Sequence, residues 1–87
     1  MTHRVELSPS AQRDLRSLPP QVAARLAGPI VALADAPRPR GSRKLRGQQT
    51  TWRVRIGPYR IIYDVYDDRE LVVVLRVDRR SESTYRR

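Results

Sequence analysis

The sequence predicts an α+β domain in the order β-α-α-β-β-β, with two N-terminal helices packed on an antiparallel sheet. Two observations indicate this class. Apolar residues recur with helical spacing in the first half of the chain, and three runs in the second half have the alternating or continuous apolar pattern of strands. Eighty-seven residues allow one hydrophobic core, so residues 1–87 are expected to form a single domain.

The first half begins with a short alternating segment, His3–Leu7, which predicts a strand. Ser8 and Pro9 then have the types typical of an N-cap and of the first helical position, and an apolar stripe follows them. A proline pair ends this helix, and a second apolar stripe predicts another helix from about Pro20 to Ala34. The prolines and glycine of Asp35–Ser42 predict a loop.

Three strands are expected in the second half: Thr51–Ile56, Tyr59–Tyr66 and Leu71–Val77. Glycine and proline separate the first two, and an aspartate pair separates the last two. In the first of these strands, alternation places one apolar set toward the helices, namely Trp52, Val54 and Ile56. The nearly continuous apolar run of the last strand is typical of a central strand covered on both faces.

The charge of the chain is its strongest global signal. Eighteen Lys and Arg residues against nine Asp and Glu give a formal charge of +9, and Lys44 is the only lysine. Such a surface attracts polyanions, which leaves nucleic acid, an acidic protein segment or an anionic membrane surface open as partners. The chain has no cysteine, no long apolar run and no apolar leader. It is therefore expected to be a cytoplasmic protein without a membrane segment.

The arginines gather where the predicted sheet would be uncovered. Arg53 and Arg55 alternate with the apolar residues of their strand, Arg60 follows on the next strand, and Arg79, Arg80 and Tyr85 come after the last strand. Residues on one face of a strand lie about 6–7 Å apart, close to the spacing of successive phosphates in extended RNA. A solvated sheet face is the alternative. Like charges gathered together favour an anionic guest, because they repel each other without one.

Other chemistries receive little support. The single histidine, His3, has no partner visible in the sequence and is expected to be structural or exposed. The one local acidic group, Asp64 with Asp67 and Asp68, is explained by turn formation. No metal and no cofactor are therefore expected.

Three segments carry a resemblance to a known family: "KLRG" at 44–47, "WRVRIGPYRIIYDV" at 52–65 and "VLRVDRRSESTY" at 74–85. With the predicted element order, they resemble the RelE/ParE toxin superfamily over nearly the whole chain. The resemblance implies the RelE-like microbial ribonuclease fold. It leaves two activities open, because RelE-type members cut mRNA in the decoding site of the ribosome whereas ParE-type members inhibit DNA gyrase.

The resemblance also implies site residues, and these favour the RelE-like branch. Catalytic positions of that branch match five residues here: Arg53, Arg55, Arg60, Arg80 and Tyr85. The implied reaction is a metal-independent attack of a ribose 2′-OH on the adjacent phosphate, giving a 2′,3′-cyclic phosphate. Four further basic residues are expected to bind RNA: Lys44, Arg46, Arg76 and Arg79.

Two departures affect the chemistry of this site. Well-known relatives have lysines where this chain has Arg53 and Arg55, and arginine does not readily accept a proton as a general base. Tyr85 is therefore the better candidate base, with base stacking as its alternative role. Arg79 and Arg80 are adjacent, so either fits the catalytic position.

The implied partners are mRNA, the ribosome and a cognate antitoxin protein that covers the arginine-bearing face. A gyrase inhibitor without nuclease activity is the alternative function. A third reading is an inactive basic domain that only pairs with a neutralising partner.

Overall fold

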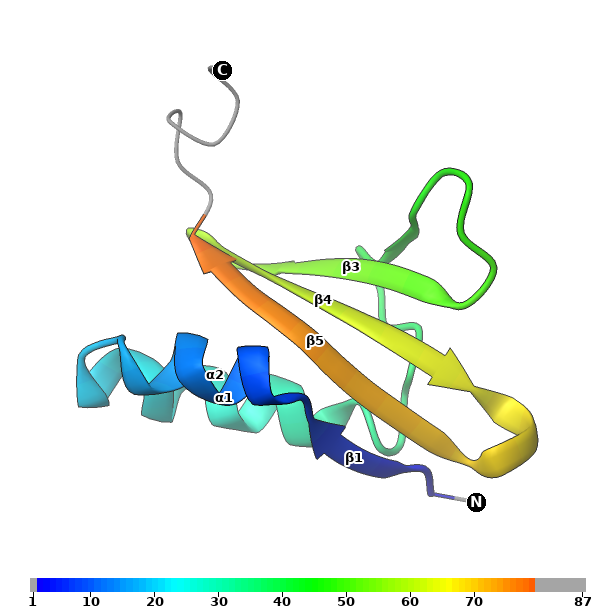
Figure 1. The fold of residues 1–87 in the computed structure, drawn as a ribbon, viewed down its shortest axis with the longest axis horizontal. Helices are drawn as coiled ribbons and strands as arrows, with labels where there is room; N and C mark the ends of the chain where they lie inside the picture. Colours follow the sequence, from blue (N-terminus) through cyan, green and yellow to red (C-terminus); the bar gives the residue numbers. More distant parts are fainter. Residues whose placement is uncertain (1, 80–87) are drawn as a thin grey trace.

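The computed structural model describes residues 2–79, in which two helices pack on one face of a five-stranded sheet (Figure 1). The elements follow in chain order: β1 (Arg4–Leu7), α1 (Pro9–Arg16), α2 (Pro20–Ala32), β2 (Arg43–Lys44), β3 (Thr51–Ile56), β4 (Tyr59–Tyr66), the 3-10 turn η1 (Asp67–Arg69) and β5 (Leu71–Arg79). The predicted α+β class is confirmed. Within residues 2–79, no helix has the length and apolar character needed to cross a membrane.

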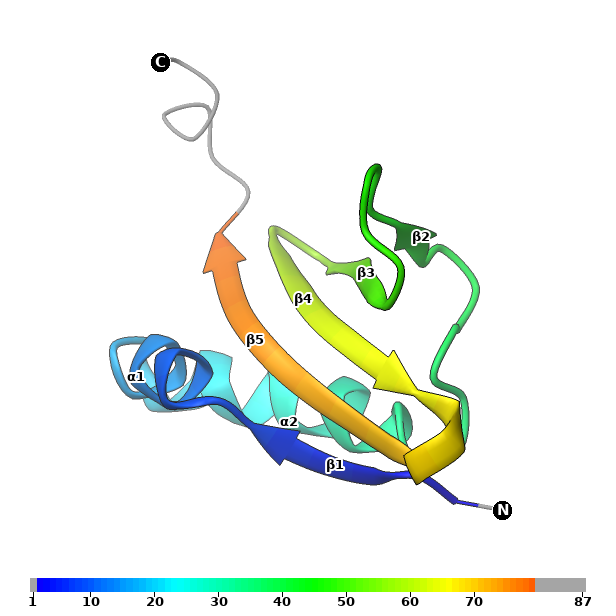
Figure 2. The same ribbon diagram turned by 45° about the vertical axis from the view of Figure 1, so that its right-hand side comes forward.

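The sheet has the order β1-β5-β4-β3-β2 and is mixed, not wholly antiparallel as predicted. The consecutive strands β2 to β5 pair antiparallel, whereas β1 pairs parallel with β5. Between β1 and β2, α1 leads the chain away from the end of β1 and α2 brings it back (Figure 2). This helical connection allows β1 to pair in parallel with β5. The two-residue strand β2 was not predicted from the sequence and forms the edge of the sheet beside β3.

The first helix begins as its sequence predicts. The Ser8 hydroxyl accepts a hydrogen bond of 3.0 Å from the N–H of Ala11, and Pro9 occupies the first turn. The second helix contains Pro29 and ends at Ala32, slightly earlier than expected. Its buried face points into the core through Leu26 and Ile30.

The core lies between the helices and the sheet. In the core, buried apolar residues of the helical half of the chain pack against buried residues of β3, β4 and β5. Its most buried side chains include Tyr63, Ile61, Val72 and Val74. On β3, Val54 is buried while Trp52 and Ile56 pack against the core from its margin. The prediction that these three residues face the helices is confirmed, so the arginines between them face the opposite side.

A bulge in β5 sets which of its residues face the core. Tyr63 is the partner of Val74, but Ile62 is the partner of Arg76, so Leu75 is an extra residue on β5. Because of this insertion, Val74 and Val77 are both buried although they are three positions apart. Arg76 consequently lies on the face opposite the helices.

Candidate functional site

The sheet face opposite the helices carries the candidate site, at the end where β3 and β4 join. One row across the strands consists of Arg55, Arg60 and Asp78, which are cross-strand partners. The neighbouring row consists of Arg43, Arg53, Ile62 and Arg76. We call these five arginines, together with Asp78, the arginine face.

The register brings together the three predicted catalytic arginines that the structure describes. Arg55 and Arg60 are direct partners, and partners in an antiparallel pair have Cα atoms about 4.5–5.5 Å apart. Arg53 lies two positions along β3 from Arg55, on the same face. Arg55 is exposed, whereas Arg53 and Arg60 are half-buried. Three guanidinium groups therefore gather at one end of the sheet.

Arg60 has an additional feature. Its Nε is buried and has no hydrogen-bond partner among residues 2–79. A buried N–H without a partner costs about 1–3 kcal/mol, so a group that bonded to it would gain more than at an exposed donor. Among residues 2–79, Arg60 is thus an arginine of this face whose guanidinium is not fully hydrogen-bonded.

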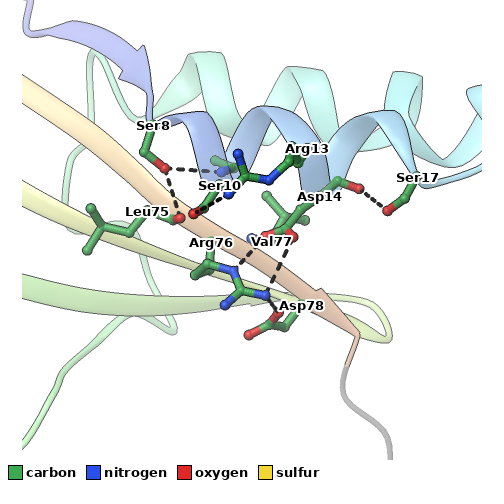
Figure 3. Close-up of polar contacts among 10 residues, drawn as sticks. Ser8, Ser10, Arg13, Asp14, Ser17, Leu75, Arg76, Val77 and Asp78 are labelled. Atoms are coloured by element: carbon green, nitrogen blue, oxygen red, sulfur yellow. Dashed lines mark hydrogen bonds and ion pairs between the residues drawn. The ribbon is translucent and has the colours of Figure 1, made fainter.

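Arg76, expected to bind RNA, forms ion pairs with two carboxylates of the protein. Its Nε donates to Oδ2 of Asp14 at 2.8 Å, and its Nη2 approaches Oδ1 of Asp78 at 3.2 Å (Figure 3). These contacts raise the pKa of Arg76, so the guanidinium stays charged. Arg76 therefore connects α1 to the arginine face.

Asp14 also fixes the backbone of β5. Its Oδ2 accepts a hydrogen bond of 2.8 Å from the N–H of Val77, and the Ser8 hydroxyl donates to the carbonyl of Leu75 at 2.9 Å (Figure 3). Partial burial acts to raise the pKa of Asp14, but the hydrogen bonds from Arg76 and Val77 outweigh it and leave this pKa below its usual value. β1 pairs with β5 only as far as Val74. Beyond that point, Asp14 of α1 provides a hydrogen-bond acceptor for the exposed backbone edge of β5.

The other predicted RNA-binding residues lie off the arginine face. Lys44 is the partner of Trp52 and Arg79 is the partner of Tyr59, so the register places both toward the helix side of the sheet. Arg46 is exposed in the loop between β2 and β3. Arg80 and Tyr85 lie outside the described residues.

A polar cluster that the sequence did not reveal holds the loop after α2 against the sheet. Arg38 forms an ion pair with Asp67 at 2.6 Å and lies 5.3 Å from the centre of the Trp52 ring. His3, expected to be structural or exposed, is mostly buried, and its Nε2 is 3.1 Å from Oδ1 of Asp67. The hydrogen bonds from Arg38 and His3 lower the pKa of Asp67. These contacts join residues far apart in the sequence, so no local pattern predicts them.

Asp64, one of the three aspartates assigned to turn formation, makes hydrogen bonds within the fold. Asp64 accepts hydrogen bonds from the hydroxyls of Thr50, Thr51 and Tyr66. Within residues 2–79, no three His, Cys, Asp or Glu side chains are grouped so that they could hold a metal ion.

An apolar cleft lies beside the arginine face, between α2 and β3. Pro29, Leu33 and Val54 line it, and Arg40 and Arg55 border it. A second hollow continues past Ile56 toward the β3–β4 turn. Apolar surface bordered by arginines suits an amphipathic protein segment with acidic residues.

Comparisons with known proteins agree with this architecture. A family model described as the ParE toxin of the type II toxin–antitoxin system parDE matches residues 5–84. The toxin RelG of Mycobacterium tuberculosis is 37% identical over 90 residues, covering all of both chains. The crystal structure of the M. tuberculosis toxin–antitoxin complex RelBE2 contains a chain that is 34% identical, with a TM-score of 0.82, over 92% of this chain and 100% of that one. A RelE–RelB complex from Pyrococcus horikoshii has a chain that is 30% identical, with a TM-score of 0.81, over 94% and 99%. The chain therefore belongs to the RelE/ParE superfamily and is a toxin of a type II toxin–antitoxin system.

Proposed function

We propose that this toxin is a ribosome-dependent mRNA endoribonuclease that inhibits translation. The observation that carries the proposal is the pairing of Arg55 with Arg60 across β3 and β4, with Arg53 beside them. A polyanion bound there relieves the repulsion between the paired Arg55 and Arg60 guanidinium groups. The relatives with RelE and RelG names favour this branch of the superfamily.

The reaction is attack of a ribose 2′-OH on the adjacent phosphate. The O2′–P bond forms, the P–O5′ bond breaks, and the products are a 2′,3′-cyclic phosphate and a 5′-hydroxyl. Negative charge develops on the phosphoryl oxygens in the transition state, and guanidinium groups already in place stabilise it. Arg60 is assigned to this role together with Arg80, while Arg53 and Arg55 orient the RNA. The ribosome supplies the remaining alignment of the mRNA.

We propose that a cognate antitoxin neutralises this toxin. The similar chains from M. tuberculosis and P. horikoshii were solved in toxin–antitoxin complexes. The apolar cleft between α2 and β3 borders Arg55, so an acidic segment seated in the cleft would reach the arginine face. Its carboxylates would then occupy the positions proposed for RNA phosphates.

Inhibition of DNA gyrase is the second candidate function. The specific observation in its favour is the matching family model, whose description names the ParE toxin. In that case the basic surface serves to bind and the protein needs no chemistry of its own.

Two parallel assays separate the candidates. The purified protein is mixed with ribosomes carrying a defined mRNA, and the new 5′ ends are mapped. The same preparation is added to gyrase and supercoiled DNA. Discrete cuts that require ribosomes support the nuclease. Gyrase inhibition without mRNA cleavage would replace that proposal with the ParE-like one.

A further inference from the structure

The proposed cleavage needs a group that accepts the 2′-OH proton, and a carboxylate is present in the row of arginines. We propose that Asp78 is this general base. The inference rests on the proposed nuclease function and concerns the same site. It assigns Tyr85 to stacking, the alternative role considered for that residue.

The register places Asp78 next to the arginine that binds the phosphate. Asp78 and Arg60 are cross-strand partners, and Arg60 is in turn the partner of Arg55. The neighbours Ile61 and Val77 are buried toward the helices, so Arg60 and Asp78 both face the opposite side. A phosphate held by Arg60 would therefore have its adjacent ribose near the carboxylate.

The carboxylate is held in place while part of it stays available. Nη2 of Arg76 contacts Oδ1 at 3.2 Å, and Asp14 fixes Arg76 through its Nε. Oδ2 of Asp78 receives no hydrogen bond from the described part of the chain, and the side chain is 28% exposed. One oxygen is thus anchored and the other can accept a proton.

The chemistry favours a carboxylate over the other groups of this face. The charged groups facing Asp78 are Arg60 on β4 and Arg76 on β5, with Asp14 of α1 behind Arg76. Arginine does not deprotonate readily, so neither arginine can act as the base. In the step proposed, the 2′-OH proton passes to Asp78 as the O2′–P bond forms. The leaving 5′-oxygen takes a proton from water, and Asp78 returns its proton to solvent.

The alternative role for Asp78 makes the opposite prediction. If the carboxylate only reduced the positive charge of the face, removing its charge would strengthen RNA binding and leave cleavage equal or faster. Asp78→Asn separates the two roles because it removes the charge and keeps the shape.

The test measures single-turnover cleavage on ribosomes carrying a defined mRNA. Asp78→Asn should lower the rate by about a hundredfold or more, with ribosome binding unchanged or tighter. Asp78→Glu should recover cleavage to within about tenfold of the natural protein. The matched control is Asp68→Asn, the same charge change in η1 at the other end of β5, which should cleave normally. An Asp78→Asn protein that cleaves at the natural rate or faster would overturn the proposal.

The pH profile of the unaltered protein provides a test that does not depend on a folded variant. Aspartates ordinarily ionise near pH 4 and tyrosines near pH 10. A carboxylate base predicts a nearly constant rate from about pH 7 to 9, whereas a phenol base predicts a rise of about tenfold per pH unit. The rising profile would contradict Asp78 as the base. If the natural protein fails to cut mRNA at all, the proposed function fails first, and this inference fails with it.

Discussion

Asp14 of α1 accepts a hydrogen bond of 2.8 Å from the backbone N–H of Val77 in β5. The same carboxylate oxygen accepts a hydrogen bond of 2.8 Å from Nε of Arg76. One helical side chain therefore satisfies the edge of β5 beyond the end of β1 and fixes the arginine that contacts Asp78. In this way the helix layer, which carries none of the predicted site residues, stabilises the strand that supports the site.

Removing this carboxylate should destabilise the fold. Asp14→Ala leaves the Val77 N–H without its partner, and we expect the free energy of unfolding to fall by about 1–3 kcal/mol. Asp14→Asn keeps an acceptor for Val77 but loses the charge, so its loss should be smaller. Urea unfolding at pH 7 measures both. Equal stability of all three proteins would show that water replaces the carboxylate.

The pH dependence of that difference has a defined sign. The folded state lowers the pKa of Asp14, so the ionised carboxylate stabilises the protein above the unfolded-state pKa near 4. The stability difference between the natural protein and Asp14→Asn should be constant from about pH 7 to 5. It should shrink below about pH 4, as the pH falls through the lowered folded-state value. A difference that grew toward acid pH would contradict the assignment.

Binding to ribosomes or RNA should weaken steeply as salt rises. Five phosphate contacts predict a log-log slope of about −3.5 for single-stranded RNA. Arg55→Gln, in the arginine face, should make the slope less steep by about 0.7. Arg4→Gln is the matched control, because Arg4 is exposed on β1 and pairs with Leu71 at the opposite end of β5. A flat plot for the natural protein would exclude polyanion binding through this face.

The period-two pattern was sufficient to predict the strands of the hairpins and their orientation. Thr51–Ile56 and Tyr59–Tyr66 have the predicted bounds, and Arg53 with Arg55 lies opposite the helices. This succeeds because side-chain alternation and a two-residue turn are local properties. The parallel pairing of β1 with β5 is not local, because the sequence separation between the two strands exceeds 60 residues.

The same distinction explains what was missed at the site. The alternation on β3 and β4 brings Arg55 to Arg60, and both were predicted. The bulge at Leu75 determines on which face of the sheet Arg76 and Asp78 lie, and no turn residue in the sequence indicates this bulge. Arg79 was expected at the site, but its pairing with Tyr59 directs it toward the helix side. Only the register shows that Asp78 lies beside Arg60.

Loss of Arg60 should slow cleavage strongly while leaving ribosome binding largely intact. A charge-stabilising group acts mainly in the transition state, so Arg60→Ala should lower the single-turnover rate by about a hundredfold to a thousandfold. Arg80→Ala should have a similar effect, because Arg80 is assigned the same role. Circular dichroism and thermal melting must show a folded protein, since Arg60 is half-buried. Normal cleavage by both folded variants would contradict the assignment of transition-state stabilisation to Arg60 and Arg80.

Substitution of Tyr85 distinguishes stacking from proton transfer. With Asp78 as the base, Tyr85→Phe keeps the ring and should cleave within about threefold of the natural rate, while Tyr85→Ala should lose about tenfold or more because stacking contributes about 1–3 kcal/mol per base. With Tyr85 as the base, removing its hydroxyl alone should cost about a hundredfold. Single-turnover cleavage of both variants beside Asp78→Asn provides the comparison. A large loss in Tyr85→Phe with normal cleavage by Asp78→Asn would assign proton transfer to the phenol.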